Sequence, residues 1–147
     1  MTSTPYHCTL LAEAYGKQGR TEDGLAQLAE ALTAAQSHEE GWWIAEVYRL
    51  KGELLLAQEG YKPQAEGDRE KTKEAEGCFL KAIEVARSQQ AKSLELRAVM
   101  SLGRLWQSQD KQAEAHQMLT EIYGWFTEGF DTKDLQEAKA LLEELSR

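Results

Sequence analysis

The chain has 147 residues, 41% of them hydrophobic, which is enough for one substantial core, and no shift in composition divides it into two domains. Its 17 basic and 25 acidic residues give a formal charge of −8, which repels phosphate backbones and anionic lipid, so we expect neither nucleic acid nor a membrane as a partner. The two cysteines lie far apart, and no apolar run approaches the roughly 20 residues that span a bilayer, which favours a reduced, cytoplasmic protein.

The composition predicts an all-α fold. Only Pro5 and Pro63 interrupt a chain that is rich in Ala, Leu, Glu, Gln and Lys, the residues that favour helices. Taken in chain order, helices are expected near residues 5–18, 21–36, 39–59, 68–89, 92–109, 111–126 and 132–146.

Several of these helices carry start signals. Ser37 with Glu40 makes a capping box, and Thr21 is followed at once by two acidic residues. Asp110 and Asp131 stand directly before two later helices, where an aspartate side chain can accept hydrogen bonds from the first free backbone N–H groups. We expect both aspartates to be caps.

Three segments repeat one pattern of small and large residues. The small positions are Ala12, Gly52 and Gly103 on the first helices and Gly24, Ala75 and Ala115 on the second. The large positions are Tyr15, Leu55, Trp106, Leu28, Phe79 and Leu119. Small residues let two helix backbones approach, and large residues fill the space around the contact, so each segment is expected to form a helical hairpin.

The numbers of residues between these small and large positions indicate one insertion. The small residues of the first helices, Ala12, Gly52 and Gly103, are separated by 40 and then 51 residues, whereas the large markers Leu28 and Phe79 are 51 apart and Phe79 and Leu119 are 40 apart. An insertion of 11 residues between the two helices of the middle hairpin accounts for all four intervals. The polar stretch near 60–73 is the expected inserted loop.

The pattern resembles the tetratricopeptide repeat, with a longer period than usual. The resemblance implies a right-handed α-solenoid in which 1–147 forms a single domain. It would contain hairpins at about 5–36, 39–89 and 92–126 and a capping helix at 132–146. No hairpin buries its apolar face alone, so the stacked hairpins would share one continuous core.

A second resemblance concerns three longer stretches, Trp42–Leu56, Gln89–Trp106 and Ile122–Leu145. They are similar to the C-terminal helical-repeat region of large bacterial predicted ATPases. In that family the repeats follow a signalling ATPase module, and the same chains carry class III nucleotide cyclase or winged-helix domains. This chain has no Gly-rich Lys-Ser/Thr loop and no room for a cyclase. The resemblance therefore implies the interaction or sensor end of a signalling protein, without the enzyme.

Residues that suggest chemistry have simpler explanations. His7, Cys8, His38, Cys78 and His116 show no metal-ligand spacing. Adjacent acidic residues such as Glu39 and Glu40 diverge on a helix, and the nucleophile candidates Ser93, Ser101 and Cys78 have no histidine on a neighbouring face. We expect no metal, no cofactor and no enzymatic activity.

Aromatic residues cluster in Trp42-Trp43 and in Tyr123–Phe126. At helical spacing such rings usually pack between helices, so packing is the favoured interpretation. The two adjacent tryptophans point about 100° apart around a helix. One of them therefore remains a candidate for an exposed anchor.

The favoured function is a protein-interaction module that binds a peptide or a partner domain in the concave groove of the solenoid. In tetratricopeptide domains first-helix residues line this groove, and the equivalents here are Thr9, Glu13, Glu46, Arg49, Glu53, Arg97, Met100 and Arg104. One hypothesis is that the three arginines converge to bind a carboxylate-bearing partner. The other is that they form ion pairs with Glu13, Glu46, Glu53 and Glu95.

A small-effector sensor that regulates an attached ATPase or cyclase is the alternative function, and a structural spacer stands behind both. An enclosed apolar pocket with a few polar groups would favour the sensor, whereas an open groove would favour the protein binder.

Overall fold

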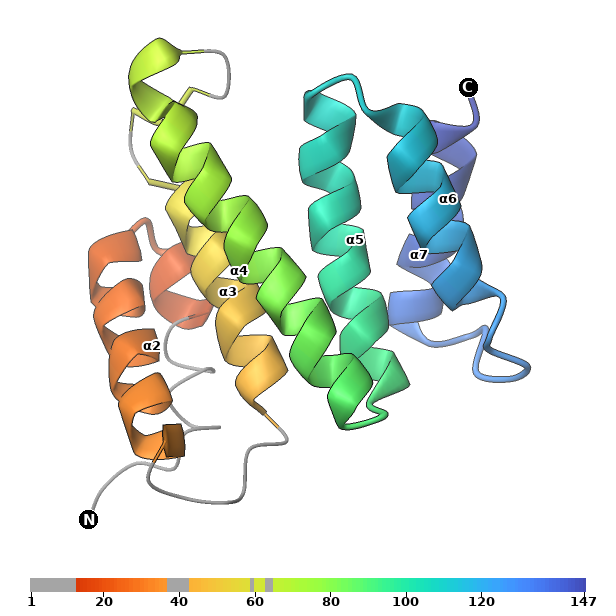
Figure 1. The fold of residues 1–147 in the computed structure, drawn as a ribbon, viewed down its shortest axis with the longest axis horizontal. Coiled ribbons are helices and arrows are strands. Elements are labelled where there is room, and N and C mark those ends of the chain that lie inside the picture. The colour runs from red at the N-terminus through yellow and green to blue at the C-terminus, as the bar shows by residue number, and fades with distance from the viewer. Residues whose placement is uncertain (1–12, 37–42, 59, 63–64) are drawn as a thin grey trace.

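The structure, a computed structural model, describes residues 13–36, 43–58, 60–62 and 65–147 (Figure 1). These residues contain helices and no strand, which confirms the all-α prediction. Residues 13–17 are helical, within the first expected helix. The α-helices that follow are α2 (Thr21–Gln36), α3 (Ile44–Leu56), α4 (Arg69–Ser88), α5 (Lys92–Ser108), α6 (Gln112–Tyr123) and α7 (Lys133–Leu145). A short 3-10 turn, η1 (Glu66–Asp68), precedes α4.

The stretch near 60–73 contains a loop and the start of α4, which begins at Arg69, next to the helix start expected at residue 68. The described part of the loop is bonded to the start of that helix. The hydroxyl groups of Tyr61 and Thr72 are 2.6 Å apart, and the backbone N–H of Lys62 donates to Asp68 Oδ2 at 2.9 Å. These bonds fix the described part of the loop against the first turn of α4.

Three of the helix ends share one turn geometry. The residue after the helix cap adopts a left-handed conformation, with φ of 77° at Gly19, 55° at Gln90 and 62° at Asp110. The next residue donates its N–H to the carbonyl five residues earlier, in the pairs Arg20–Tyr15 (2.7 Å), Ala91–Ala86 (2.8 Å) and Lys111–Trp106 (2.9 Å). This is the Schellman motif, which satisfies carbonyl groups that the end of a helix leaves without partners.

This turn shows why the expected cap at Asp110 is wrong. Asp110 closes α5, and Lys111 stands at the N-cap of α6 without a side-chain hydrogen bond. The expected cap at Asp131 is wrong by one residue, because Thr132 caps α7 and its Oγ1 accepts the N–H of Leu135 at 3.4 Å. Thr21 is already the first residue of α2, and the capping box at Ser37 and Glu40 lies outside the described residues.

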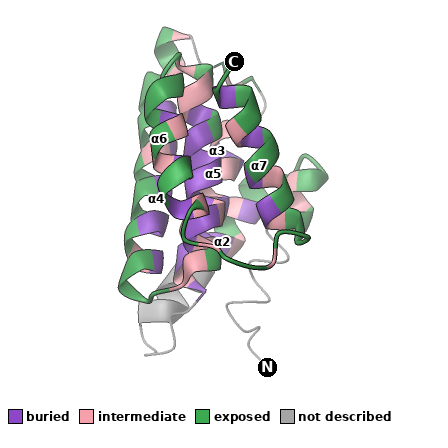
Figure 2. Ribbon diagram, turned by 90° about the vertical axis from the view of Figure 1, so that its right-hand side faces the viewer, coloured by how far each residue is buried: buried purple, intermediate pink, exposed green. Residues whose placement is uncertain are grey.

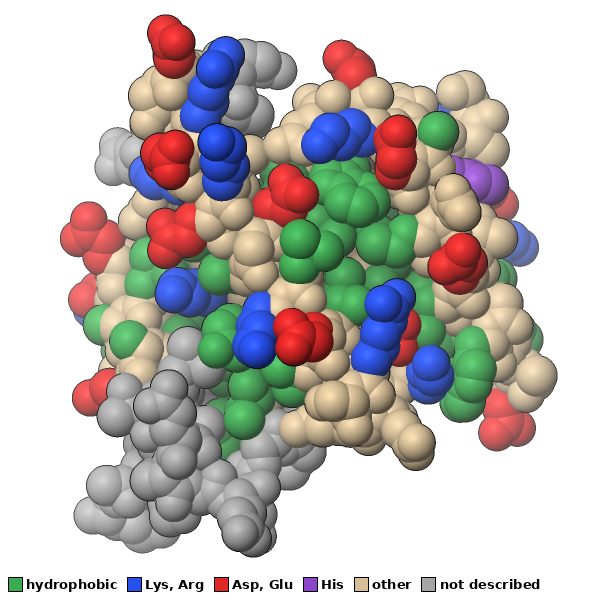
Figure 3. Space-filling model, in the orientation of Figure 1, with side chains coloured by type: hydrophobic (Ala, Val, Ile, Leu, Met, Phe, Trp, Pro, Cys, Tyr) green, Lys and Arg blue, Asp and Glu red, His purple; other side chains and the backbone are tan. Residues whose placement is uncertain are grey.

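The helices form two layers. Each of α2 to α6 contacts the next helix, and in addition α3 contacts α5 and α5 contacts α7. No Cα atoms of α2 and α4, or of α4 and α6, lie within 8 Å of each other. In the view of Figure 1, α4 and α6 lie in front, and Figure 3 shows hydrophobic side chains between them, over α5. The helices α3, α5 and α7 therefore form a continuous layer, whereas α2, α4 and α6 are spread apart.

The core is made of two apolar clusters. The larger lies among α3 to α7 and includes Phe79, Leu102 and Leu119, and its purple residues face the centre in Figure 2. The smaller joins α2 to α3 through the buried residues Leu28, Trp43, Val47, Leu50 and Leu54. Leu25 packs against both clusters.

Of the large residues in the repeat pattern, Leu28, Leu55, Phe79 and Leu119 are buried, whereas Tyr15 and Trp106 are half-buried. Trp43 is buried as well, and Trp42 lies outside the described residues. Among the described residues of the Tyr123–Phe126 stretch, Trp125 departs from the packing prediction, because 57% of it is exposed.

Candidate functional site

The polar residues of α3, α5 and α7 meet on one side of the continuous layer, which we call the inner face. Its members are Glu46, Arg49 and Glu53 on α3, Arg97, Ser101 and Arg104 on α5, and Asp134 and Glu137 on α7. On each helix they are three or four residues apart, the spacing that places side chains on the same side of a helix. All the arginines that the sequence assigned to the groove are in this set.

Glu46 is the centre of the inner face. Its two carboxylate oxygens accept from Nε of Arg49 at 2.6 Å and from Nη2 at 3.0 Å, a forked arrangement, and Oε2 also pairs with Nη1 of Arg97 at 2.5 Å. Burial disfavours the charge on the Arg49 guanidinium, but its hydrogen bonds to Glu46 and the nearby carboxylates outweigh this, and its pKa is raised. Arg49 and Arg97 are therefore held in internal ion pairs.

The remaining pairs of the inner face are longer. Arg97 Nε lies 3.8 Å from Asp134 Oδ1, and Arg104 Nη2 lies 3.9 Å from Glu137 Oε2. About half of the Arg104 side chain is exposed, compared with 12% of Arg49. Arg104 is thus the arginine with the most free capacity to bind a partner.

The two hypotheses for the arginines can now be compared with the geometry. The ion-pair alternative describes Arg49 and Arg97, which pair with Glu46. Glu53 also lies near Arg49, 3.9 Å from its Nη1. The other two glutamates of that alternative pair elsewhere: Glu13 lies 3.6 Å from Lys17, and Glu95 is bonded to Arg87 and Lys92.

A cleft of about 220 Å³ opens between α3 and α5. It is lined by Glu53, Leu56, Tyr61, Ser101, Arg104, Leu105 and Ser108. Glu53 and Arg104 supply one charge of each sign, whereas Leu56 and Leu105 supply apolar walls. The cleft is open rather than enclosed. It can take a short apolar or polar side chain of a partner next to the Arg104 guanidinium.

One described residue that was assigned to the groove does not contribute to its surface. Met100 is only 2% exposed and belongs to the larger apolar cluster, so placing it on the binding surface was wrong. Its position is equivalent to that of Arg49, but α5 is covered on more sides than α3. Thr9 lies outside the described residues.

Several residues of the inner face and its cleft were not found from the sequence. Tyr61 and Ser108 line the cleft and come from the loop before α4 and from the last turn of α5, and Asp134 and Glu137 come from α7. The two α7 residues are three apart, like Glu46 and Arg49, so the same spacing rule would have found them.

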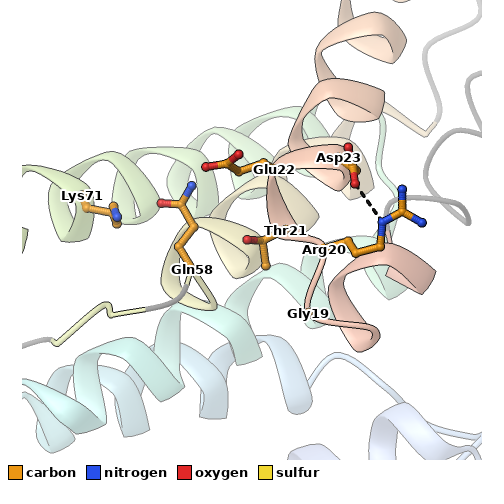
Figure 4. Close-up of a pocket in the computed structure, with 7 residues that line it drawn as sticks. All are labelled: Gly19, Arg20, Thr21, Glu22, Asp23, Gln58 and Lys71. Carbon is orange, nitrogen blue, oxygen red and sulfur yellow. Dashed lines mark hydrogen bonds and ion pairs between the residues drawn. The ribbon is translucent and has the colours of Figure 1, made fainter.

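A second cleft, of about 620 Å³, lies at the start of α2 (Figure 4). Its lining is entirely polar or glycine and consists of Gly19, Arg20, Thr21, Glu22, Asp23, Gln58 and Lys71. Arg20 Nε and Asp23 Oδ2 are 2.8 Å apart, and the Arg20 guanidinium also lies 4.7 Å from the centre of the Tyr15 ring. The sequence analysis did not identify this site, which combines three segments that are distant in sequence.

Other features offer no chemistry. Among the described residues, no group of three His, Cys, Asp or Glu side chains could hold a metal ion, and no helix is long and apolar enough to cross a bilayer. His7, Cys8 and His38 lie outside those residues. Burial raises the pKa of the Cys78 thiol, with Glu74 adding to the effect and Lys51 opposing it, so this thiol is a poor nucleophile at neutral pH.

Comparisons of the chain with protein-family models, with curated proteins and with solved structures find no match. The resemblance to the repeat region of bacterial ATPases accordingly stays a prediction.

Proposed function

We propose that the chain is a protein-interaction module that binds a peptide or partner domain on its inner face. Arg104, exposed at the edge of the cleft between α3 and α5, would pair with a carboxylate of the partner, and Leu56 and Leu105 would contact a neighbouring apolar side chain. The observation that carries this proposal is the weak internal pairing of Arg104, 3.9 Å from Glu137, beside an open cleft.

We further propose a tetratricopeptide-like solenoid. Two observations support it. Contacts between α3 and α5 and between α5 and α7, without contacts among α2, α4 and α6, are what a curved stack of hairpins produces on its inner side. The Schellman turns at Gly19, Gln90 and Asp110 repeat one geometry along the chain. On the second resemblance, the module would belong to a cytoplasmic bacterial signalling protein of the ATPase or cyclase type.

The test is a selection of peptides from a random display library on the purified chain, followed by titration of the selected peptides. We expect enrichment of Asp and Glu, and an affinity that is about tenfold or more weaker for Arg104→Gln. Lys139→Gln, an exposed cation of α7 that does not line the cleft, is the matched control. Peptides that contain no acidic residue, or that bind Arg104→Gln as tightly as the parent chain, would overturn the proposal.

The alternative of a small-effector sensor gains no support from this geometry, because both clefts are open and the larger one, at the start of α2, has a polar lining instead of the enclosed apolar pocket expected of a sensor.

A further inference from the structure

The side of the molecule opposite the inner face carries an apolar groove between α4 and α6. The two helices have no Cα atoms within 8 Å of each other, and Figure 3 shows hydrophobic side chains in the hollow between them, over α5. On α5, Trp106 is half-buried and lies about 200° around the helix from Arg104. Trp106 therefore lies on the groove side of α5, away from the inner face.

Leu80 and Met118 supply the walls of this groove. Leu80 is 46% exposed and lies nearly two helical turns before Arg87, which is paired with Glu95 of α5 at 3.0 Å, so Leu80 is on the side of α4 next to α5. Met118 of α6 is half-buried and packs against the larger apolar cluster. It lies about 140° around α6 from Tyr123, whose ring contacts the loop that leads to α7. Met118 is thus on the other side of α6 from that loop.

An acidic side chain lies beside Trp106. The helices α4 and α5 run in opposite directions, and eleven residues are close to three helical turns. Moving eleven residues back from Arg87 and eleven forward from its partner Glu95 leads to Glu76 and Trp106, so these two lie at the same level and on facing sides of their helices. Glu76 is half-buried, and it has no ion pair with any residue that the structure describes.

The α6 edge of the groove is acidic as well. Glu114 and Glu121 are four residues before and three after Met118, on the same side of α6, and both are exposed. Neither is in an ion pair within the described part of the chain. The exposed cations nearby, Lys73 and Lys111, lie at one end of the groove only. The middle of the groove thus combines apolar walls with uncompensated negative charge.

We propose that this groove binds an amphipathic helix of a partner protein that carries Lys or Arg beside its apolar stripe. The apolar side chains would contact Leu80, Met118 and Trp106, and one cation would lie between the Glu76 carboxylate and the Trp106 ring. A helix fits better than an extended segment, because the described residues contain no strand whose edge could pair with it. The proposal goes beyond the function of the inner face, which lies on the opposite side and would take an acidic partner.

The experiment is calorimetry of the full chain with three synthetic peptides of about 18 residues, five helical turns. They share one stripe of Leu and Ala and carry Lys, Gln or Glu at the flanking positions. We expect the Lys peptide to bind at least about tenfold more tightly than the Glu peptide, because the groove repels the latter. No binding of the Lys peptide, or equal binding of the Lys and Glu peptides, would overturn the proposal.

Two variants of α4 locate the site, and a third is the control. Glu76→Gln and Leu80→Gln should each weaken binding of the Lys peptide about fivefold or more. Glu74→Gln removes the same charge about 200° around α4 and should change the affinity by less than about twofold. Thermal unfolding followed by circular dichroism checks that all three are folded. Normal binding by both Glu76→Gln and Leu80→Gln would show that the peptide binds elsewhere.

Trp106 provides a readout inside the groove. Its indole N–H is buried and has no acceptor among the described residues, and its NMR signal can be assigned with Trp106→Phe. We expect this signal to shift with the Lys peptide and not with the Glu peptide. A parent chain that sediments as a dimer, with Leu80→Gln a monomer, would show that a second copy occupies the groove and would overturn the proposal. Arg104→Gln should bind the Lys peptide as the parent chain does, so the two proposals fail separately.

Discussion

Gly52 lies directly against the ring of Phe79. A Cβ atom added at Gly52 would be 2.5 Å from Phe79 Cε1, closer than atoms can approach. At Gly103 the nearest atoms to such a Cβ are Leu141 Cδ2 at 3.7 Å and Ala115 Cβ at 4.0 Å, which are ordinary contact distances. The sequence predicted equivalent positions for the two glycines, yet of the two only Gly52 has no room for a side chain.

We therefore expect opposite effects from one substitution at the two sites. Gly52→Ala should lower the free energy of unfolding by roughly 1 to 2 kcal/mol, because the buried Phe79 ring must move. Gly103→Ala should leave it unchanged or raise it by up to about 1 kcal/mol, since alanine is the better helix former. Urea denaturation of the two variants measures both. Equal effects would mean that the helix contact at Gly52 relaxes freely.

The residue scale is also where sequence reasoning failed most. Asp110 carries a typical capping side chain, but its backbone is left-handed and closes the preceding helix. Glycine marks such a turn at Gly19, whereas Gln90 and Asp110 adopt the same conformation without that signal. The turn is set by hydrogen bonds to the end of the helix, and side-chain identity alone does not reveal it.

At the scale of single elements, α7 depends on Thr132. Its Oγ1 accepts the N–H of Leu135 and donates to the carbonyl of Gly129 at 2.7 Å, so one side chain joins the loop to the helix. Thr132→Ala should cost about 1 kcal/mol, while Asp131→Ala should cost only a few tenths. Thermal unfolding of both variants makes the comparison. A larger loss of stability for Asp131→Ala than for Thr132→Ala would show that Asp131 is the cap, as the sequence predicted.

The helices themselves were largely predictable, because helix-forming residues and small-residue spacing both act locally. The helix expected from residue 68 agrees with the start of α4 at Arg69, although its first residues are polar. Thr72 among them is buried and bonded to Tyr61, a contact that polarity alone does not predict. Glu46, Arg49, Arg97 and Arg104 were brought together as expected, because they follow the helical period.

At the scale of the whole molecule, the two apolar clusters differ in size, and α2 belongs mainly to the smaller one. Among the described elements, α2 contacts only α3, whereas α5 contacts α3, α4, α6 and α7. We expect amides of α2 to exchange with solvent at least about tenfold faster than those of α5, through opening that leaves the larger cluster intact. Hydrogen exchange followed by NMR measures this difference. Equal protection of both helices would indicate that the chain unfolds only as one unit.

The polar cleft at the start of α2 is the feature that could be predicted least from the sequence. Its walls come from residues 19–23, from Gln58 and from Lys71, and only the packing of α2 and α4 on α3 brings them together. The inner face was easier to predict because its residues recur every three or four positions along each helix. The cleft at α2 is made of segments that share no such spacing.

The shared turn at Gly19, Gln90 and Asp110 bears on how such a chain changes over generations. The same turn precedes α2, α5 and α6. Because backbone hydrogen bonds make the turn, it does not require one particular side chain at the left-handed position, which here is Gly, Gln or Asp. Substitution at that position can therefore leave the path of the chain between two helices unchanged.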